Sequence, residues 1–237
     1  MEKHQVIQAI LHRLKTGCQW RELPMKQFFD VAYKWQAVYH HFRKWSDDGS
    51  WDKLWQFLLK KHKTKLDLSS IQLDGSHTLA KRGGQAVAYQ GRKKSKTSNM
   101  LIITDNHGVP ITCSNAVAGN HSDAYHLEQT VEGMLKNIQA SEISTDGLFL
   151  NADAGFDTLG FRDSCFTSNI IANIDSNQRN GKKQQHIFDD LLYKRRFVIE
   201  RTNAWLDAFK SLLVRFETKP LHWRALHLIA FVVILLR

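Results

Sequence analysis

The spacing of apolar residues changes once along the chain, near Leu66, and this change constrains the fold more than any other feature. Before it, apolar residues recur every three or four positions, as from Val6 to Leu14, which is the period of a helix with one buried face. After it, short apolar runs of strand length alternate with helical patterns. The sequence therefore predicts a helical region over 1–66 and an α/β region over 67–237.

Three helices are predicted in the first region. The first ends at Gly17, because glycine commonly follows the last helical residue. Pro24 breaks the chain before a second periodic segment from Phe28 to Trp45, and the polar stretch around Gly49 precedes a third helix. The five tryptophans of this region are interpreted as core residues: Trp20, Trp35, Trp45, Trp51 and Trp55.

The second region predicts three strands followed by a helix, and then strand, helix, strand and helix. The strands are expected within 69–77, 99–105, 109–119, 147–153 and 169–175, and the helices within 123–138, 158–166 and 188–216. The polar DNHG segment joins two of the strands as a hairpin, Asp123 is placed to cap the first helix, and 176–186 is expected to be a loop. This order predicts an α/β fold with a mixed sheet.

Two of these strands lead to an aspartate. The first strand of the α/β region is expected to end at Asp74, and the apolar run 148–150 leads to Asp153. Isolated aspartates after strands commonly form turns, so a turn role for Asp153 stays open. The alternative is that a strand end holds a catalytic acid rigidly.

A third acid, Glu200, lies within the helix predicted over 188–216. At about 100° per residue, Tyr193, Arg196 and Glu200 fall on one face, together with Asn203, whereas the opposite face is apolar. A solvated helix face and a polar stripe that faces a site give the same pattern. Both interpretations therefore remain open on spacing alone.

Three rigidly held carboxylates suit phosphoryl transfer with Mg²⁺. Hard divalent cations prefer oxygen ligands. Two such ions, about 3.5–4 Å apart, can activate an attacking oxygen and stabilise the leaving one. No single acid indicates this chemistry, but the combination of Asp74, Asp153 and Glu200 does.

The charge of the chain points to an anionic partner. Lys and Arg number 33 against 23 Asp and Glu, which gives a net charge of +10. Nucleic acid is the commonest polyanion that a soluble protein meets, and an anionic membrane surface is the alternative. The longest apolar run, 228–236, is shorter than the roughly 20 residues that a spanning helix needs, and the basic stretch QGRKKSK has no apolar helix face beside it, so no membrane partner is expected.

The cysteines indicate neither a disulfide framework nor a zinc site. Cys18, Cys113 and Cys165 are odd in number, far apart and without C-x-x-C spacing. We expect buried free thiols and a reducing cytoplasm.

Several motifs together resemble one protein family. The segments LDGSH, NADAGFD and YKRRFVIERTNAWLDAFKSLLVRF resemble the three acidic motifs of DDE transposases from bacterial insertion sequences of the IS4/IS5 type. The third contains their Y-x2-R-x3-E signature as Tyr193, Arg196 and Glu200. TGCQWRELP, KRGGQAVAYQGRKKSKTSNMLIITD and AGNHSDAYHLE match as well, so the resemblance covers essentially all 237 residues.

The resemblance implies a ribonuclease-H-like catalytic core over 67–237, preceded by a small helical DNA-binding region over 1–66. It implies that Asp74, Asp153 and Glu200 bind two Mg²⁺ ions, which Mn²⁺ can replace. The 47 positions from Asp153 to Glu200 leave no room for the large β insertion domain of some relatives. It also implies double-stranded DNA as partner (terminal inverted repeats and target), a homodimer in the DNA complex, and a place in the bacterial cytoplasm at the nucleoid.

Other residues take expected roles from this context. The basic cluster of 92–96 is either a solvated loop or a clamp on the DNA backbone, and the neighbouring acids favour the clamp. The residues expected to contact DNA are Arg92, Lys93, Lys94, Lys96, Arg196, Arg201, Asn203 and Lys210. Tyr193, His77 and His121 are expected to support the site, the histidines through surface or hydrogen-bonding roles.

Two departures from the family pattern keep alternatives open. Asp207 stands where the family usually has Lys or Arg, and the next basic residue is Lys210. The chain also begins almost at its first helix, so we expect a shortened chain with weaker recognition of DNA ends. The leading hypothesis is a transposase that cleaves element ends and transfers the 3′-OH to target DNA. The alternatives are a copy that binds DNA without transposing it and a structure-specific nuclease.

Overall fold

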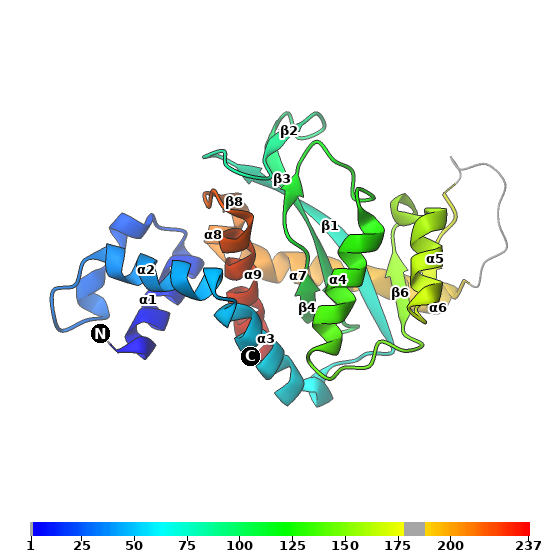
Figure 1. Ribbon diagram of the computed structural model, residues 1–237, viewed down its shortest axis with the longest axis horizontal. Helices are drawn as coiled ribbons and strands as arrows, with labels where there is room; N and C mark the ends of the chain where they lie inside the picture. The colour runs from blue at the N-terminus through cyan, green and yellow to red at the C-terminus, as the bar shows by residue number, and fades with distance from the viewer. Residues whose placement is uncertain (1, 178–187) are drawn as a thin grey trace.

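The computed structural model describes residues 2–177 and 188–237, whose arrangement is shown in Figure 1. The chain begins with the helices α1 (Lys3–Thr16), α2 (Trp35–Asp47) and α3 (Ser50–Lys61) and the short 3-10 turns η1 (Trp20–Glu22), η2 (Met25–Gln27) and η3 (Lys63–Lys65). As expected, α1 ends at Gly17, which takes a left-handed backbone conformation with a φ of 70°. The second helix begins at Trp35, later than predicted, and the segment before it is irregular although Phe29 within it packs into the core.

The described strands form one mixed sheet built around a long central strand. They are β1 (Ser70–Ala80), β2 (Ala88–Gln90), β3 (Ser95–Thr104), β4 (Pro110–Cys113), β5 (Val117–Ala118), β6 (Phe149–Ala152), β7 (Ile171–Ile174) and β8 (Val214–Arg215). β1 pairs antiparallel with β3 on one edge and parallel with β6 on the other. β3 continues antiparallel to β4, through the expected hairpin, and β6 continues parallel to β7.

This topology confirms the expected fold class. The order β4-β3-β1-β6-β7, antiparallel on one side of β1 and parallel on the other, is the arrangement of a ribonuclease-H-like core with a mixed sheet. The connections that lead from β5 to β6 and from β6 to β7 are helical, as parallel strands require. They are η4 (Ala154–Phe156) with α5 (Leu159–Thr167), and α4 (Leu127–Gln139) links β5 to β6. In Figure 1, α4 crosses in front of the sheet and α7 (Val198–Asp207) passes behind it.

The sequence predicted that Asp74 ends its strand, and this prediction is wrong. β1 continues for six more residues, to Ala80, because its other edge keeps pairing with β3 as far as Leu79. β8 pairs parallel with the far end of β1, at Leu79 and Ala80. The parallel partner β6, however, stops beside Leu73, so Asp74 lies where the two-sided pairing of the strand ends.

The long helix predicted over 188–216 is wrong as a single element. The segment divides into α6 (Asp190–Tyr193), the 3-10 turn η6 (Lys194–Phe197), α7, α8 (Lys210–Leu213) and β8. Phe209 leaves the helical conformation, with φ −95° and ψ 94°. Beyond α8 the chain becomes extended, and the buried Arg215 guanidinium donates to the carbonyls of Gln85 and Thr218 and to the hydroxyl of Ser98.

The C-terminal apolar run forms α9 (Pro220–Leu235), a buried helix that packs against α2, α3 and β4. A single hydrophobic cluster joins Phe42 and Trp55 of the first helices, Phe231 of α9 and Leu150 of the sheet. The helical region and the sheet therefore share one core. Over residues 2–177 and 188–237, no helix is both long enough and apolar enough to cross a bilayer.

The cysteines and most tryptophans behave as expected. All three thiols are free, with Cys113 and Cys165 buried and Cys18 half-buried. Burial raises the pKa of Cys113 to about 11 and that of Cys165 to about 12, so both thiols stay protonated and unreactive at neutral pH. Trp51 and Trp55 are buried in the core, whereas Trp35 is only half-buried.

Gly17 provides a test of the contact between the first helix and the C-terminal segment. A Cβ added at Gly17 would lie 3.0 Å from Cβ of Lys210, whereas one added at Gly49, which has a similar φ of 73°, would meet nothing within 4 Å. Both Gly17→Ala and Gly49→Ala should cost about 1 kcal/mol for the left-handed backbone. Gly17→Ala should cost about 1 kcal/mol more, because α8 must shift. Equal losses in urea unfolding would contradict this packing.

Candidate active site

The register of β1 against β6 brings the first two acids side by side. Leu73 and Ala152 are the last Cα partners of this parallel pair. Asp74 and Asp153 are the next residues of the two strands, and therefore emerge at the same edge of the sheet. Because neighbouring strands lie about 4.8 Å apart, the backbone positions that carry Asp74 and Asp153 are adjacent.

Asp153 also performs the turn role that its sequence context suggested. Its carboxylate accepts a hydrogen bond from the backbone N–H of Gly155 at 3.0 Å, and this starts η4. The side chain is exposed, so one oxygen caps the turn while the rest of the carboxylate remains open to a ligand. The two interpretations of Asp153 are thus compatible.

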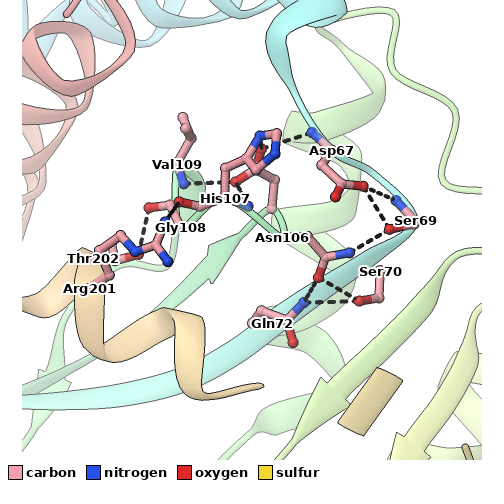
Figure 2. A network of polar contacts seen from close by, with 11 residues as sticks. Asp67, Ser69, Ser70, Gln72, Asn106, His107, Gly108, Val109, Arg201 and Thr202 are labelled. Carbon is pink, nitrogen blue, oxygen red and sulfur yellow. Dashed lines mark hydrogen bonds and ion pairs between the residues drawn. The ribbon is translucent and has the colours of Figure 1, made fainter. Parts of the chain in front are cut away.

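Glu200 is carried by the first turn of α7, and a polar network fixes that helix against the β3–β4 hairpin (Figure 2). Thr202 donates its hydroxyl to the carbonyl of Gly108 at 2.6 Å, and Arg201 donates to the carbonyl of His107 at 3.3 Å. The buried carboxylate of Asp105 holds the hairpin itself by accepting from the backbone N–H groups of His107 and Val109. The hairpin therefore positions the helix that bears Glu200.

A second network, made of buried amides, fastens the start of the same segment to the sheet. Asn151 of β6 donates to the carbonyl of Leu192 at 2.9 Å, and Asn173 of β7 donates to the carbonyl of Asp189 at 3.0 Å. Asn151 also donates to Gln72 of β1 at 2.8 Å. Buried polar groups of this kind are costly unless paired, so their pairing specifies where α6 lies. Sequence reasoning missed these residues, although amides inside apolar strands are a visible signal.

Asp74 is the most electrostatically perturbed of the three acids. Burial raises its pKa to about 6, and repulsion from Asp123 and Glu200 adds to this, against a backbone hydrogen bond from Gly75 and the charge of Arg196. Glu200 and Arg196 therefore lie close enough to act on Asp74. A cation placed among these carboxylates would relieve the repulsion, and oxygen donors are what Mg²⁺ prefers.

Asp123 is a neighbour of this site that the sequence did not reveal. It was expected to cap the helix over 123–138, but α4 begins at Leu127 and has His126 at its N-cap position. The carboxylate of Asp123 instead packs onto Gly75, where any Cβ would overlap it. It accepts a hydrogen bond from Asn99 at 2.5 Å and lies 3.8 Å from His77. Asp123 therefore packs against β1 and does not cap α4.

Tyr193 and Arg196 lie together on the segment that leads into α7. The Arg196 guanidinium lies 5.5 Å from the Tyr193 ring centre and 5.2 Å from that of Phe197. Its Nε is buried and has no hydrogen-bond partner. Burial raises the pKa of Tyr193, Arg196 lowers it, and the charge of Asp153 raises it. Tyr193 is therefore near Asp153, and Arg196 acts on both Tyr193 and Asp74.

The basic cluster of 92–96 forms the tip of the β2–β3 hairpin. Arg92, Lys93, Lys94 and Lys96 are all exposed. Arg92 and Lys93 lower the pKa of His77, after the larger effect of burial, which places the tip near His77. Because His77 is three residues along β1 from Asp74, the basic tip and the acids belong to one region of the sheet.

The remaining expected residues are more dispersed. Arg201 is exposed near the Trp205 ring, and Asn203 is half-buried on α7. His121 is stacked on Tyr125 at 3.6 Å, in the loop before α4. Lys210 lies at the start of α8, where its backbone and Cβ face Gly17, on the side of the first helices.

Asp74 and Asp153 lie at one edge of the sheet and Glu200 is near Asp74, but the three acids do not form a closed cluster. Among the described residues, no three acidic, histidine or cysteine side chains are placed to hold a metal ion as they lie. Asp153 and Glu200 are exposed, and their side chains have room to turn. The arrangement can gather oxygen ligands beside a basic surface, which is what metal-assisted chemistry on a phosphodiester needs.

The raised pKa of Asp74 predicts a pH-dependent effect of removing its charge. A carboxyl group with a raised pKa stabilises the fold fully below pH 4, and this contribution is lost as the pH rises through about 6. Without divalent metal, Asp74→Asn should therefore gain stability relative to the natural chain between pH 4 and pH 7.5, by about 2 to 3 kcal/mol. Urea unfolding at both pH values measures this difference. A difference that does not change with pH would contradict the buried, repelled state of Asp74.

Comparison with known proteins gives two family matches. Residues 62–235 match the model of the transposase DDE domain, and residues 1–55 match the model of an IS4/5 family of transposases. A relative from Burkholderia cepacia, the uncharacterized 16.2 kDa protein of insertion element IS402, is 33% identical over 79 residues. This overlap covers 32% of the present chain and 52% of the relative, so the chain spans about half the length of that protein.

Solved structures give looser overlaps. The Mos1 transposase paired-end complex with the left transposon end has a TM-score of 0.34 and 14% identity, over 96% of this chain and 75% of that one. The catalytic domain of Mos1 mariner transposase has a TM-score of 0.34 and 12% identity, over 76% and 87% of the two chains. Overlaps this loose carry no conclusion about the present site.

Proposed function

The chain belongs to the DDE transposase family, and from this premise we propose that it cleaves the ends of an insertion sequence and transfers the freed 3′-OH into target DNA. The observation that supports this most is the meeting of Asp74 and Asp153 at one sheet edge, with Glu200 close enough to raise the pKa of Asp74. Region 1–66 would contribute to DNA binding, and 67–237 would carry the catalytic core.

In this proposal the three acids are metal ligands. Two Mg²⁺ ions, or Mn²⁺ in their place, would activate the attacking oxygen and stabilise the leaving one. Asp74 and Asp153 would hold the ions from their adjacent strands, and Glu200 would contribute from α7. Their fit to hard cations rests on the all-oxygen donor set and on the repulsion at Asp74, which a bound cation would offset.

The proposed substrate is double-stranded DNA, both terminal inverted repeats and target. The exposed cations of the β2–β3 hairpin would contact phosphates and fix the register of the duplex, with Arg196, Arg201 and Asn203 contributing from the segment around Glu200. Lys210 would reach DNA only on the side of the first helices. Two element ends must be joined, so the active form would be a homodimer, acting in the bacterial cytoplasm at the nucleoid.

A copy that binds DNA without transposing it is the second candidate, because Asp207 is an exposed acid where the family usually has a cation. A structure-specific nuclease is the third. An assay on a plasmid that carries the two DNA ends of the element distinguishes these three functions. A transposase yields excised and rejoined products, a binder yields only a shifted band, and a nuclease yields cuts without strand transfer.

Removing any one of the three acids should abolish catalysis while leaving DNA binding intact. Asp74→Asn, Asp153→Asn and Glu200→Gln should each lower Mg²⁺-dependent end cleavage by about a thousandfold or more, because a ligand of the reacting centre is lost. Asp163→Asn, at an exposed acid of α5, is the matched control and should cleave normally. Normal cleavage by Glu200→Gln would refute the assignment. Ca²⁺ should support binding without turnover.

The hairpin contact can be tested through the salt dependence of binding. Arg92→Ala with Lys94→Ala should weaken binding of any duplex and reduce the slope of log K against log salt by about two, since each phosphate contact contributes about 0.9. The control double variant Lys60→Ala with Lys136→Ala removes the same charge from ion pairs elsewhere on the surface. If both double variants change the slope equally, the hairpin does not contact DNA.

A further inference from the structure

A cavity outside the acidic site lies between the first helices and the far end of the sheet. It has a volume of about 680 Å³ and is lined from α1, the η1 segment, α2, the loop after β1 and the segment after β8. This volume falls within the range of pockets that hold small molecules. Its rings are those of Trp20, Trp35, Tyr39, Phe216 and, from α9, His222, and its cations besides Arg13 are Arg21 and Arg82.

The charge of this cavity favours an anionic ligand. On its floor, Arg13 donates to Glu217 at 2.7 Å and to Ser211 at 2.9 Å, so the charge of this buried arginine is already neutralised. Arg21 and Arg82 are exposed, and neither forms an ion pair with a described residue. The cavity therefore keeps two free cations, which suits a phosphate group.

The aromatic lining favours a flat ring. One face of Trp20 is covered by the Arg13 guanidinium, 4.6 Å from the ring centre. Trp35 is only half-buried, and Phe216 is 47% exposed, so their faces are available. The sequence predicted that Trp35 is a core residue, but it lines this cavity instead. Nucleic-acid bases stack on such rings whatever their sequence.

The strand that carries Asp74 also leads to the rim of the cavity. β1 runs directly from Asp74 to Ala80, and Arg82 follows two residues later. Six residues of strand span about 20 Å. A DNA strand rises about 3.4 Å per nucleotide, so this span corresponds to about six nucleotides.

We propose that this cavity binds one unpaired nucleotide of the DNA. Its base lies against Trp35 and Phe216, and its phosphate lies between Arg21 and Arg82. The inference rests on the proposed function for the presence of DNA, but it does not depend on cleavage. It gives the chain a second DNA contact, which acts on a nucleotide displaced from the duplex about six positions from the acids.

The test uses the full chain and two synthetic decamers: oligothymidylate, and the same phosphate backbone with every base removed. Binding is followed through tryptophan fluorescence in EDTA. The decamer with bases should bind about tenfold or more tightly, because stacking adds to the phosphate contacts. Phe216→Ala should remove most of this difference, and Arg82→Ala should weaken binding of both decamers. Unfolding midpoints should remain close to that of the natural chain, since both side chains are exposed.

Matched controls come from exposed residues outside the cavity. Phe166→Ala on α5, where the ring is 85% exposed, and Lys81→Ala beside Arg82 should bind both decamers as the natural chain does. Equal binding of the two decamers, or no effect of Phe216→Ala and Arg82→Ala, would overturn the proposal. Glu200→Gln separates it from the proposed function. That variant should lose cleavage and keep the preference for bases, so either proposal can fail without the other.

Discussion

The parallel pairing of β1 with β6 is the interaction on which the candidate site depends. It stops at Leu73 and Ala152, and the next residue of each strand is an acid. β1 continues past this point because β3 pairs with its other edge. Asp74 is therefore held within a rigid strand but is free of a neighbour on one side. Its raised pKa is a direct consequence of that half-enclosed position among other carboxylates.

The second requirement is that a helix distant in sequence returns to this edge. Amides on β6 and β7 bind the backbone at Asp189 and Leu192, and the β3–β4 hairpin binds α7 through Thr202. The amides and the Thr202 hydroxyl bond are buried, and the bonds are specific, so they fix the segment at both ends. The exposed carboxylate of Glu200 lies between the two anchors, on a backbone that is held while its side chain can turn.

Much of the fold could be predicted from the sequence, because period and turn chemistry are local. The change of pattern near Leu66, the helix end at Gly17 and the DNHG hairpin are of this kind. The prediction of one long helix over 188–216 was wrong because a long-range contact outweighs local helix propensity there. The buried Arg215 side chain bonds to Gln85 and Ser98, and the backbone at this residue is a strand. Asp123 precedes a helical pattern, so the sequence predicts a helix cap. Its position near the site follows only from the close approach of its carboxylate to Gly75, which the sequence does not reveal.

Site-directed cutting of the backbone by bound Fe²⁺ would show whether Asp74, Asp153 and Glu200 gather around metal ions. With Fe²⁺ in place of Mg²⁺ in the DNA complex, ascorbate and peroxide generate radicals that cut only nearby polypeptide. If the three acids hold the ions, cuts are expected beside Asp74 in β1, after β6 and in the first turn of α7, and excess Mg²⁺ should suppress all of them. Cuts at only one of these places, or elsewhere in the chain, would contradict this arrangement.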